Sequence, residues 1–381
     1  QGVMGISYIQ LTRVLLLLVS TTPLVVSSHL IESHVIPRTL SLYVLTASAL
    51  MTALGAYVTG ACALRITRSH VLLGVLFLVG ACATLFAPDP FLSVFSTPDR
   101  MEGLVLWFML IVYAFLLSHF FDASWWRTWL ILNVCIGSMI ALFGLSQYGG
   151  SFVTTDTEGR IDIFFGNPVF YGAYMLCIAV LTTCIFFSLR TTIGRLGAGA
   201  LMCLSYTALI LSGTRSVMLG VCGGIIVGLL CYAYTSPKRL RAFLSVGVVS
   251  LVLVLGIGGL FALQGAGVLK SDILDRFRAL GEGDIRTQAR YYHYTVALQG
   301  IKEGPVLRYG FEGYTTVFER FVAPRYYGDT LSSTPEPWSD RAHNEYLDLA
   351  VSMGVPGALI FVGLLLYTGI CLFRTLSRDR M

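Results

Sequence analysis

Ten apolar runs divide the chain, and each is long enough, or nearly so, to cross a hydrocarbon core of about 30 Å. The runs cover 14–31, 40–63, 71–87, 103–121, 128–147, 168–189, 196–211, 216–235, 242–263 and 356–373. The polar segments between them are short, except for one that extends from Gln264 to Arg341. This pattern predicts an all-α polytopic membrane protein with about ten or more transmembrane helices and one large helical outer loop.

Three parts of the chain follow from this pattern. Residues 1–263 are expected to hold transmembrane helices one to nine, 264–342 a large extracytoplasmic loop with short helices, and 343–381 a short helix followed by the last transmembrane helix. Because the chain starts at Gln1 and stops at Met381, directly after a basic turn, we expect both ends to be trimmed from a longer protein.

The long polar region shows its own helical periodicity. Four segments are expected there: helices at 271–280 and 284–302, irregular chain over 310–337, and a short helix at 342–353. Gly304-Pro305 should stop the second of these helices, because proline cannot continue the hydrogen-bond ladder. Val355-Pro356-Gly357 should separate the short helix from the last membrane helix.

The composition agrees with a membrane protein. The chain is 55% hydrophobic and 12% charged, with a mean hydropathy of +0.75, whereas soluble domains carry about 25% charged residues. The outer loop has no cysteine, and the nine cysteines contain no C-x-x-C spacing, so neither a disulfide framework nor a zinc site is predicted. We expect no metal and no cofactor. The net charge of +5 reflects the inner loops rather than a nucleic-acid surface.

The short loops differ in their basic content, which predicts their sides of the membrane. When the loops are numbered alternately from the N-terminal tail, one set holds twelve Lys and Arg residues, beginning with Arg13. The opposite short loops hold only Arg38, Arg100, Arg160 and Arg215. Because cytoplasmic loops are rich in Lys and Arg, the first set should be cytoplasmic. The long loop then falls outside by parity, together with most of the polar residues.

His343 lies where the long loop re-enters the bilayer, next to Asn344. A capping or interfacial role is the commoner fate of a single histidine. Two features favour chemistry instead: a polar setting at the start of a helix can tune the pKa of the imidazole, and the other polar residues gather on the same face of the membrane. His343 is therefore the candidate catalytic residue.

Arginines on the outer face are candidates for binding an anion. Arg215 lies in a turn with three hydroxyl residues, before a helix whose free amides add partial positive charge; the alternative is a topological arginine with a buried stem. Arg290 begins Arg-Tyr-Tyr-His-Tyr on the second loop helix. Other arginines compete for the same role, and spacing does not choose among them: Arg276, Arg278, Arg286 and Arg308.

Two upstream segments have simpler interpretations. Arg160 precedes Asn167-Pro168, which is a common N-cap arrangement. Arg100 and Glu102 are close enough in sequence to form a local pair.

Carboxylates on the outer loop at 88–102 suggest a rival site. Asp89 and Asp99 could hold a divalent cation, since hard cations prefer oxygen ligands. Their ten-residue separation matches no metal-ligand spacing, and solvated acids in proline-shaped turns are the preferred interpretation.

Together these residues resemble the signature of the O-antigen ligase/polymerase superfamily. The motifs are, in chain order, Arg100-Met-Glu-Gly103, Arg160 with Phe165-Gly-Asn-Pro168, Ser212-x-x-Arg215, Arg290-x-x-x-Tyr294, and His343-Asn-x-x-Leu347 with Gly354-x-x-Gly357. The resemblance covers about 88 to 373. Tyr294 stands where tryptophan is common, and Pro356 lies inside the glycine motif; neither affects the chemistry.

The resemblance implies transfer of a glycan from an undecaprenyl-diphosphate carrier at the outer side of the bacterial cytoplasmic (inner) membrane, in a multi-pass protein whose active site faces the periplasm. The acceptor would be lipid A-core for a ligase, another carrier-linked glycan for a polymerase, or a protein hydroxyl for an O-oligosaccharyltransferase. The implied chemistry is inverting and independent of metal. By position, His343 matches the base, Arg215 and Arg290 match the diphosphate-binding residues, and Arg160, Arg100 and Asn344 are further candidates for binding substrate.

Two other functions remain open from the residues alone. A metal-dependent membrane glycosyltransferase would use Asp89 and Asp99. A flippase or exporter of lipid-linked glycans would need a polar path through the membrane, and the scarcity of charged residues within the apolar runs argues against it.

Overall fold

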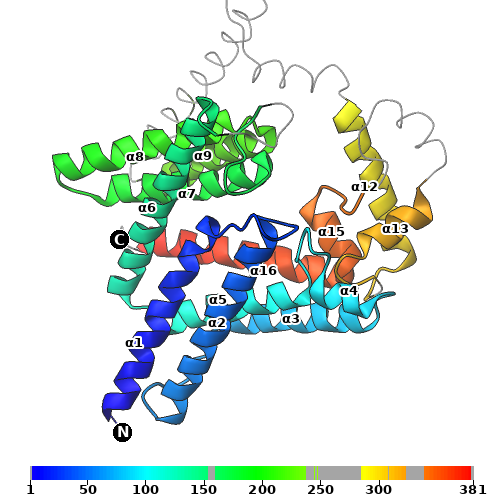
Figure 1. Cartoon of the computed structure of the whole chain (residues 1–381), viewed down its shortest axis with the longest axis horizontal. Helices are drawn as coiled ribbons and strands as arrows, with labels where there is room; N and C mark the ends of the chain where they lie inside the picture. The colour runs from blue at the N-terminus through cyan, green and yellow to red at the C-terminus, as the bar shows by residue number, and fades with distance from the viewer. Residues whose placement is uncertain are drawn as a thin grey trace, which may run out of the picture. The chain divides into compact units, whose positions relative to one another are not determined.

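The computed structural model describes residues 2–152, 159–236, 244, 247, 285–307, 309–322 and 339–378. Every regular element in the described residues is helical (Figure 1). The elements are α1 (Gly2–Leu18), η1 (Val19–Leu24), α2 (Val35–Val58), α3 (Arg68–Leu85), α4 (Pro90–Phe95), α5 (Leu104–Phe120), α6 (Ala123–Tyr148), α7 (Pro168–Ser188), α8 (Thr192–Leu211), α9 (Arg215–Thr235), α12 (Ile285–Glu303), α13 (Tyr314–Phe321), α15 (Glu345–Ser352) and α16 (Gly354–Arg378).

The membrane helices confirm the predicted fold class. Seven helices in the described residues are long and apolar enough to cross a membrane, namely α2, α3, α6, α7, α8, α9 and α16, and α5 is a shorter apolar helix. The chain is thus an all-α polytopic membrane protein. The run expected to be short at 196–211 forms a helix of 20 residues, because Thr191 caps it before the apolar pattern begins. The run at 242–263 lies, apart from residues 244 and 247, outside the described residues.

The prediction for the first apolar run is wrong. The sequence predicts a helix over 14–31, but α1 ends at Leu18 and a 3-10 segment follows it to Leu24. Pro23 lies inside that segment. Its ring would clash with the carbonyl group four residues earlier in an α-helix, so the tighter 3-10 form replaces the α-helix there.

The described part of the long polar region contains one helix that the sequence does not predict. α12 ends at Glu303, which confirms the stop at Gly304-Pro305. α13 is a helix in the stretch expected to be irregular, and it forms because Tyr314, Val317 and Phe318 bury one face of it. The short helix expected at 342–353 is α15. The expected helix at 271–280 and the irregular segment 324–337 lie outside the described residues.

The chain divides into two compact units, which we describe separately. One comprises Gln1–Ile136 and Ile285–Leu365, and the other Gly137–Asp284 and Leu366–Met381. In the first unit, α12, α13 and α15 share a core that includes Val296, Tyr314 and Phe318. A second cluster of Leu76, Phe311, Leu349 and Met353 joins that core region to α3. The helices of the polar region are therefore packed firmly against the membrane helices of their own unit.

Candidate functional site

Three segments that are far apart in the sequence meet at Arg341. One guanidinium nitrogen of Arg341 donates to Glu102 Oε2 and to Glu312 Oε1, at 2.7 Å each. The Glu312 side chain is only 3% exposed, whereas that of Glu102 is 43% exposed. Arg100 Nε donates to Asp340 Oδ2 at 2.7 Å. The pairing expected between Arg100 and Glu102 is therefore wrong, because each of them binds a residue of the segment just before His343.

The two glutamates create an unusual electrostatic setting for Arg341. Burial alone would lower the pKa of Arg341, but the Glu312 and Glu102 carboxylates outweigh it, so that the pKa is raised. Burial raises the pKa of Glu102, and the charges of Arg341 and Arg100 oppose that shift. The guanidinium is thus held permanently charged between two acids.

The backbone around this cluster adopts conformations that side chains rarely allow. Ser96, Met101, Glu312 and His343 have φ values of 66°, 53°, 62° and 55°. The Ser96 hydroxyl donates to Glu312 Oε1 at 2.7 Å. A positive φ at a residue other than glycine costs free energy, and it persists only where the surrounding structure enforces it. We infer that the ion pairs hold in place the three chain segments that carry these four residues.

Two glycines allow these turns to pack closely. A Cβ atom on Gly103 would lie 2.5 Å from the Val94 carbonyl oxygen. At Gly310, which has a φ of +71°, a Cβ atom would lie 2.5 Å from both Ala87 Cβ and Ser93 Oγ. Only glycine fits such approaches without displacing the backbone.

His343 is exposed and immediately precedes the cap of α15. The Asn344 side chain accepts hydrogen bonds from the amides of Tyr346 and Leu347, at 3.0 and 3.3 Å. On the other side of His343, the Ala342 amide donates to Asp348 Oδ1 at 2.8 Å. Both neighbours of the histidine are therefore fixed to the same short helix.

Asp348 is itself a perturbed group. Burial raises the pKa of its carboxyl group to about 6, although the hydrogen bond from Ala342 and the charge of Arg341 oppose the shift. A buried carboxylate that accepts a backbone amide is well suited to fix the direction of the chain. The buried Asp348 carboxyl group therefore binds the backbone next to His343 rather than facing solvent.

A second histidine, His293 on α12, lies beside His343. The two ring centroids are 5.3 Å apart with an interplanar angle of 71°. His293 is 3% exposed, and its Nδ1 lies 3.2 Å from the Tyr314 hydroxyl. Burial, and then the nearby His343, lower the pKa of His293 to about 4. His293 is consequently neutral at pH 7. The sequence pattern does not single it out, although it lies within the Arg290 motif.

Arg290 is one helical turn before His293 on α12 and is exposed. Residues three apart on an α-helix share a face. His293 contacts His343, and Arg290 precedes His293 by three residues on the same helix. The structure therefore groups four of the predicted residues in one unit: Arg100, Arg290, His343 and Asn344.

Arg215 and Arg160 belong to the other unit. Arg215 is the first residue of α9, after Gly213 with a φ of 63°. The Ser212 hydroxyl donates to Leu209 O at 2.7 Å and the Thr214 hydroxyl to Pro168 O at 3.1 Å. These two hydroxyls hold the turn, so Arg215, Ser216 and the start of the helix remain of the anion-binding site expected there.

Arg160 leads into a buried segment, since Asp162 after it is 3% exposed and accepts a hydrogen bond from Gln147 Nε2 at 2.6 Å. Asn167 caps α7 by accepting from the Val169 amide at 2.8 Å, which confirms the capping interpretation.

The remaining candidates are local or lie outside the described residues. Asp89, from the rival carboxylate pair, caps α4 by accepting from the Leu92 amide at 2.9 Å. The side chain of Arg286 and all of Arg276, Arg278 and Arg308 fall outside the described residues.

Part of this chain matches a known protein family. Residues 199–362 match the family described as O-antigen ligase. The matched segment contains Arg215, Arg290, His343 and Asn344, whereas Arg100 and Arg160 precede it. No curated protein and no solved structure matches the chain.

Proposed function

We propose, on the match of residues 199–362 to the O-antigen ligase family, that the chain is a member of the O-antigen ligase/polymerase superfamily and transfers a saccharide from undecaprenyl diphosphate to an acceptor hydroxyl. The site faces the periplasm from a multi-pass protein of the bacterial cytoplasmic membrane. One observation supports the proposal: the exposed His343 follows Arg341, which forms two ion pairs, and its ring lies beside the buried His293 of α12, which is neutral at pH 7.

His343 acts as the general base in this proposal. Its imidazole takes the proton of the acceptor hydroxyl while the hydroxyl oxygen attacks the anomeric carbon from the face opposite the carrier. The bond from that carbon to the phosphate oxygen breaks, and the configuration inverts. A positioned base of this kind contributes about 10²–10⁴-fold in rate. No metal ion is required for these steps.

The leaving group needs charge stabilisation more than a proton, because a diphosphate departs as an anion. Arginine provides permanent charge and paired donors that match phosphate oxygens. We assign this role to Arg290 and Arg215, with Arg160, Arg100 and Asn344 as further substrate contacts. Since Arg100 is engaged by Asp340, its contribution would be to hold the loop as well as to meet substrate.

The acceptor defines the type of enzyme. An O-antigen ligase, which we favour, would use lipid A-core, whereas a polymerase would use another carrier-linked glycan and an O-oligosaccharyltransferase a protein hydroxyl. We propose that the extracytoplasmic loop 264–342, and within it 306–340, selects the acceptor, while 343–381 carries the base and 1–263 the membrane helices.

The proposal is tested with purified protein, an undecaprenyl-diphosphate-linked glycan, EDTA and each of the three acceptors in turn. We expect product with one acceptor, and a loss of about 10²–10³-fold in rate for Arg290→Ala and for Arg215→Ala. Arg320→Ala is the matched control, since Arg320 lies on α13 in the same polar region and pairs with Glu303. Full activity of either test variant, or loss of activity in EDTA, would contradict the proposed chemistry.

A further inference from the structure

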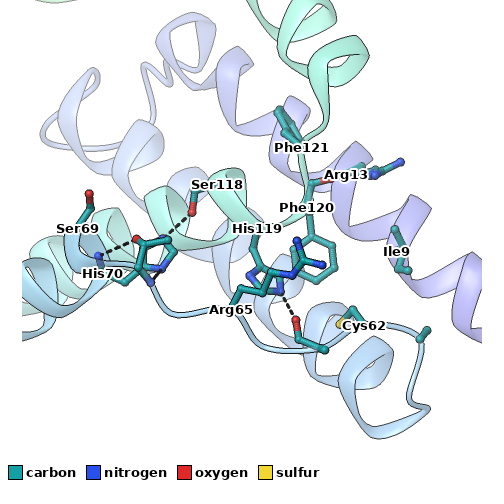
Figure 2. Close-up of a pocket in the computed structure, with 13 residues that line it drawn as sticks. Ile9, Arg13, Cys62, Arg65, Ser69, His70, Ser118, His119, Phe120 and Phe121 are labelled. Atoms are coloured by element: carbon teal, nitrogen blue, oxygen red, sulfur yellow. Dashed lines mark hydrogen bonds between the residues drawn. The ribbon is translucent and has the colours of Figure 1, made fainter. Parts of the chain in front are cut away.

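A polar cavity lies at the start of α3 and the end of α5, in the same unit as His343 (Figure 2). Its volume is about 660 Å³, and it is lined by α1, the loop between α2 and α3, the start of α3 and the end of α5. Within the described part of the chain, no acidic residue lines it, but two arginines and two histidines do: Arg13, Arg65, His70 and His119. This composition indicates a site for an anion.

The two arginines differ in how they are held. Arg13 donates from Nε to Phe120 O at 2.8 Å and lies 3.1 Å from Asp122 Oδ2 outside the cavity lining. Arg65 is exposed, and the described residues place no carboxylate within ion-pair distance of it. Arg65 can therefore bind an anionic ligand, whereas the Arg13 side chain is held in place by its contacts with Phe120 and Asp122.

The two histidines are held in defined orientations on the cavity wall. His70 Nδ1 accepts from the Thr67 amide at 3.1 Å, so its Nε2 carries the proton that bonds Ser118 Oγ at 2.7 Å. His119 Nε2 lies 2.9 Å from Ala63 O, a carbonyl that can only accept, so Nε2 is also the donor there. The hydrogen bond from His119 on α5 to Ala63 therefore fixes the loop that carries Arg65.

The cavity opens at the level where membrane helices end. α3 is long and apolar enough to span a membrane, and α5 packs against it at His70 and Phe115. The residues on both sides of Arg65 are apolar and exposed, Leu64 at 55% and Ile66 at 66%. An arginine between two exposed apolar side chains fits a position where a charged head and acyl chains meet.

We propose that this cavity binds the phosphate group of an anionic phospholipid from the cytoplasmic leaflet. The distribution of Lys and Arg places this end of the helices in the cytoplasm. The Arg65 guanidinium binds the phosphate oxygens, Arg13 and the histidines line the headgroup, and Leu64 and Ile66 contact the acyl chains. A soluble phosphate ion presents the same chemistry without the chains, and the experiment separates the two sources.

The test uses the whole chain in detergent and measures lipid binding by native mass spectrometry. The probes are phosphatidylglycerol, which is anionic, and phosphatidylethanolamine, whose amine neutralises its phosphate. Arg65→Ala should weaken phosphatidylglycerol binding about tenfold or more, because it removes the charge-assisted hydrogen bonds to the phosphate oxygens. Arg68→Ala is the matched control, since Arg68 is an exposed arginine of the same region that does not line the cavity.

We expect preferential binding of phosphatidylglycerol that is sensitive to Arg65→Ala, insensitive to Arg68→Ala and not displaced by inorganic phosphate. Equal binding of the two lipids, or equal effects of the two variants, would overturn the site. Displacement of phosphatidylglycerol by inorganic phosphate would show that the site binds free phosphate rather than a lipid headgroup. An unchanged unfolding temperature of Arg65→Ala shows that a loss of binding does not come from loss of the fold.

Discussion

The ion pairs of Arg341 should control the order of the loop that carries His343. Replacing Arg341 by methionine removes the guanidinium and keeps much of its apolar stem. Glu312, whose side chain is 3% exposed, would then be a buried charge without that partner. Removing one partner of a buried ion pair costs about 3–5 kcal/mol. The bond to Glu102 adds little to this figure, because Glu102 is 43% exposed and exposed pairs contribute about 0–1 kcal/mol.

The assay is hydrogen exchange of the segment 339–348, where the Ala342 amide is bound to buried Asp348. Since each 1.4 kcal/mol is a factor of ten, Arg341→Met should accelerate its exchange about a hundredfold or more. Arg320→Met is the control, because Arg320 is 51% exposed in its pair with Glu303. For that variant we expect a change of about fivefold or less.

The double variant Arg341→Met with Glu312→Gln tests the origin of the effect. Because it removes the buried charge as well as its partner, it should exchange more slowly than Arg341→Met alone. Exchange of Arg341→Met at the wild-type rate would refute the reasoning, and so would a double variant that is at least as destabilised as the single one.

Three further predictions concern the same region. Burial lowers the pKa of His293 to about 4, below its ordinary 6.5, so its contribution to stability is present above pH 6.5 and is lost as the pH falls towards 4. The unfolding temperature should therefore drop more between pH 7 and pH 5 in the wild type than in His293→Gln; equal drops would contradict this. Asn344→Ala removes the cap of α15 and should cost about 1 kcal/mol, measured as exchange of the first-turn amides. Gly103→Ala places a Cβ atom 2.5 Å from the Val94 carbonyl and should destabilise by about 1–3 kcal/mol, seen as a lower unfolding temperature; an unchanged value would show that the turn can shift freely.

Local signals predict much of the helical framework. The Asn167-Pro168 cap and the stop at Gly304-Pro305 are readable from the sequence because each acts within a few residues of itself. The membrane helices are readable because a run of about 20 apolar residues is typical of a segment that crosses a bilayer. The error in α1 arises because hydropathy continues through Pro23, while the regular α-helical backbone does not.

The contacts around His343 could not be predicted from spacing. Arg100 and Asp340 are 240 positions apart, and Arg341 and Glu102 are 239 positions apart. A single sequence reports on near neighbours, so it favours a pair between Arg100 and Glu102. α13 escapes prediction for a related reason: eight residues with Gly313 before them resemble a loop until a core is available to bury their apolar face.

The central claim is that His343 is the base for the transfer. The most direct measurement is the single-turnover transfer rate from an undecaprenyl-diphosphate-linked glycan for wild type, His343→Ala and His29→Ala, with His29 an exposed histidine of a different loop. We predict a loss of about 10²–10⁴-fold for His343→Ala, with a normal unfolding temperature, and no loss for His29→Ala. Transfer by folded His343→Ala at close to the wild-type rate would contradict the account.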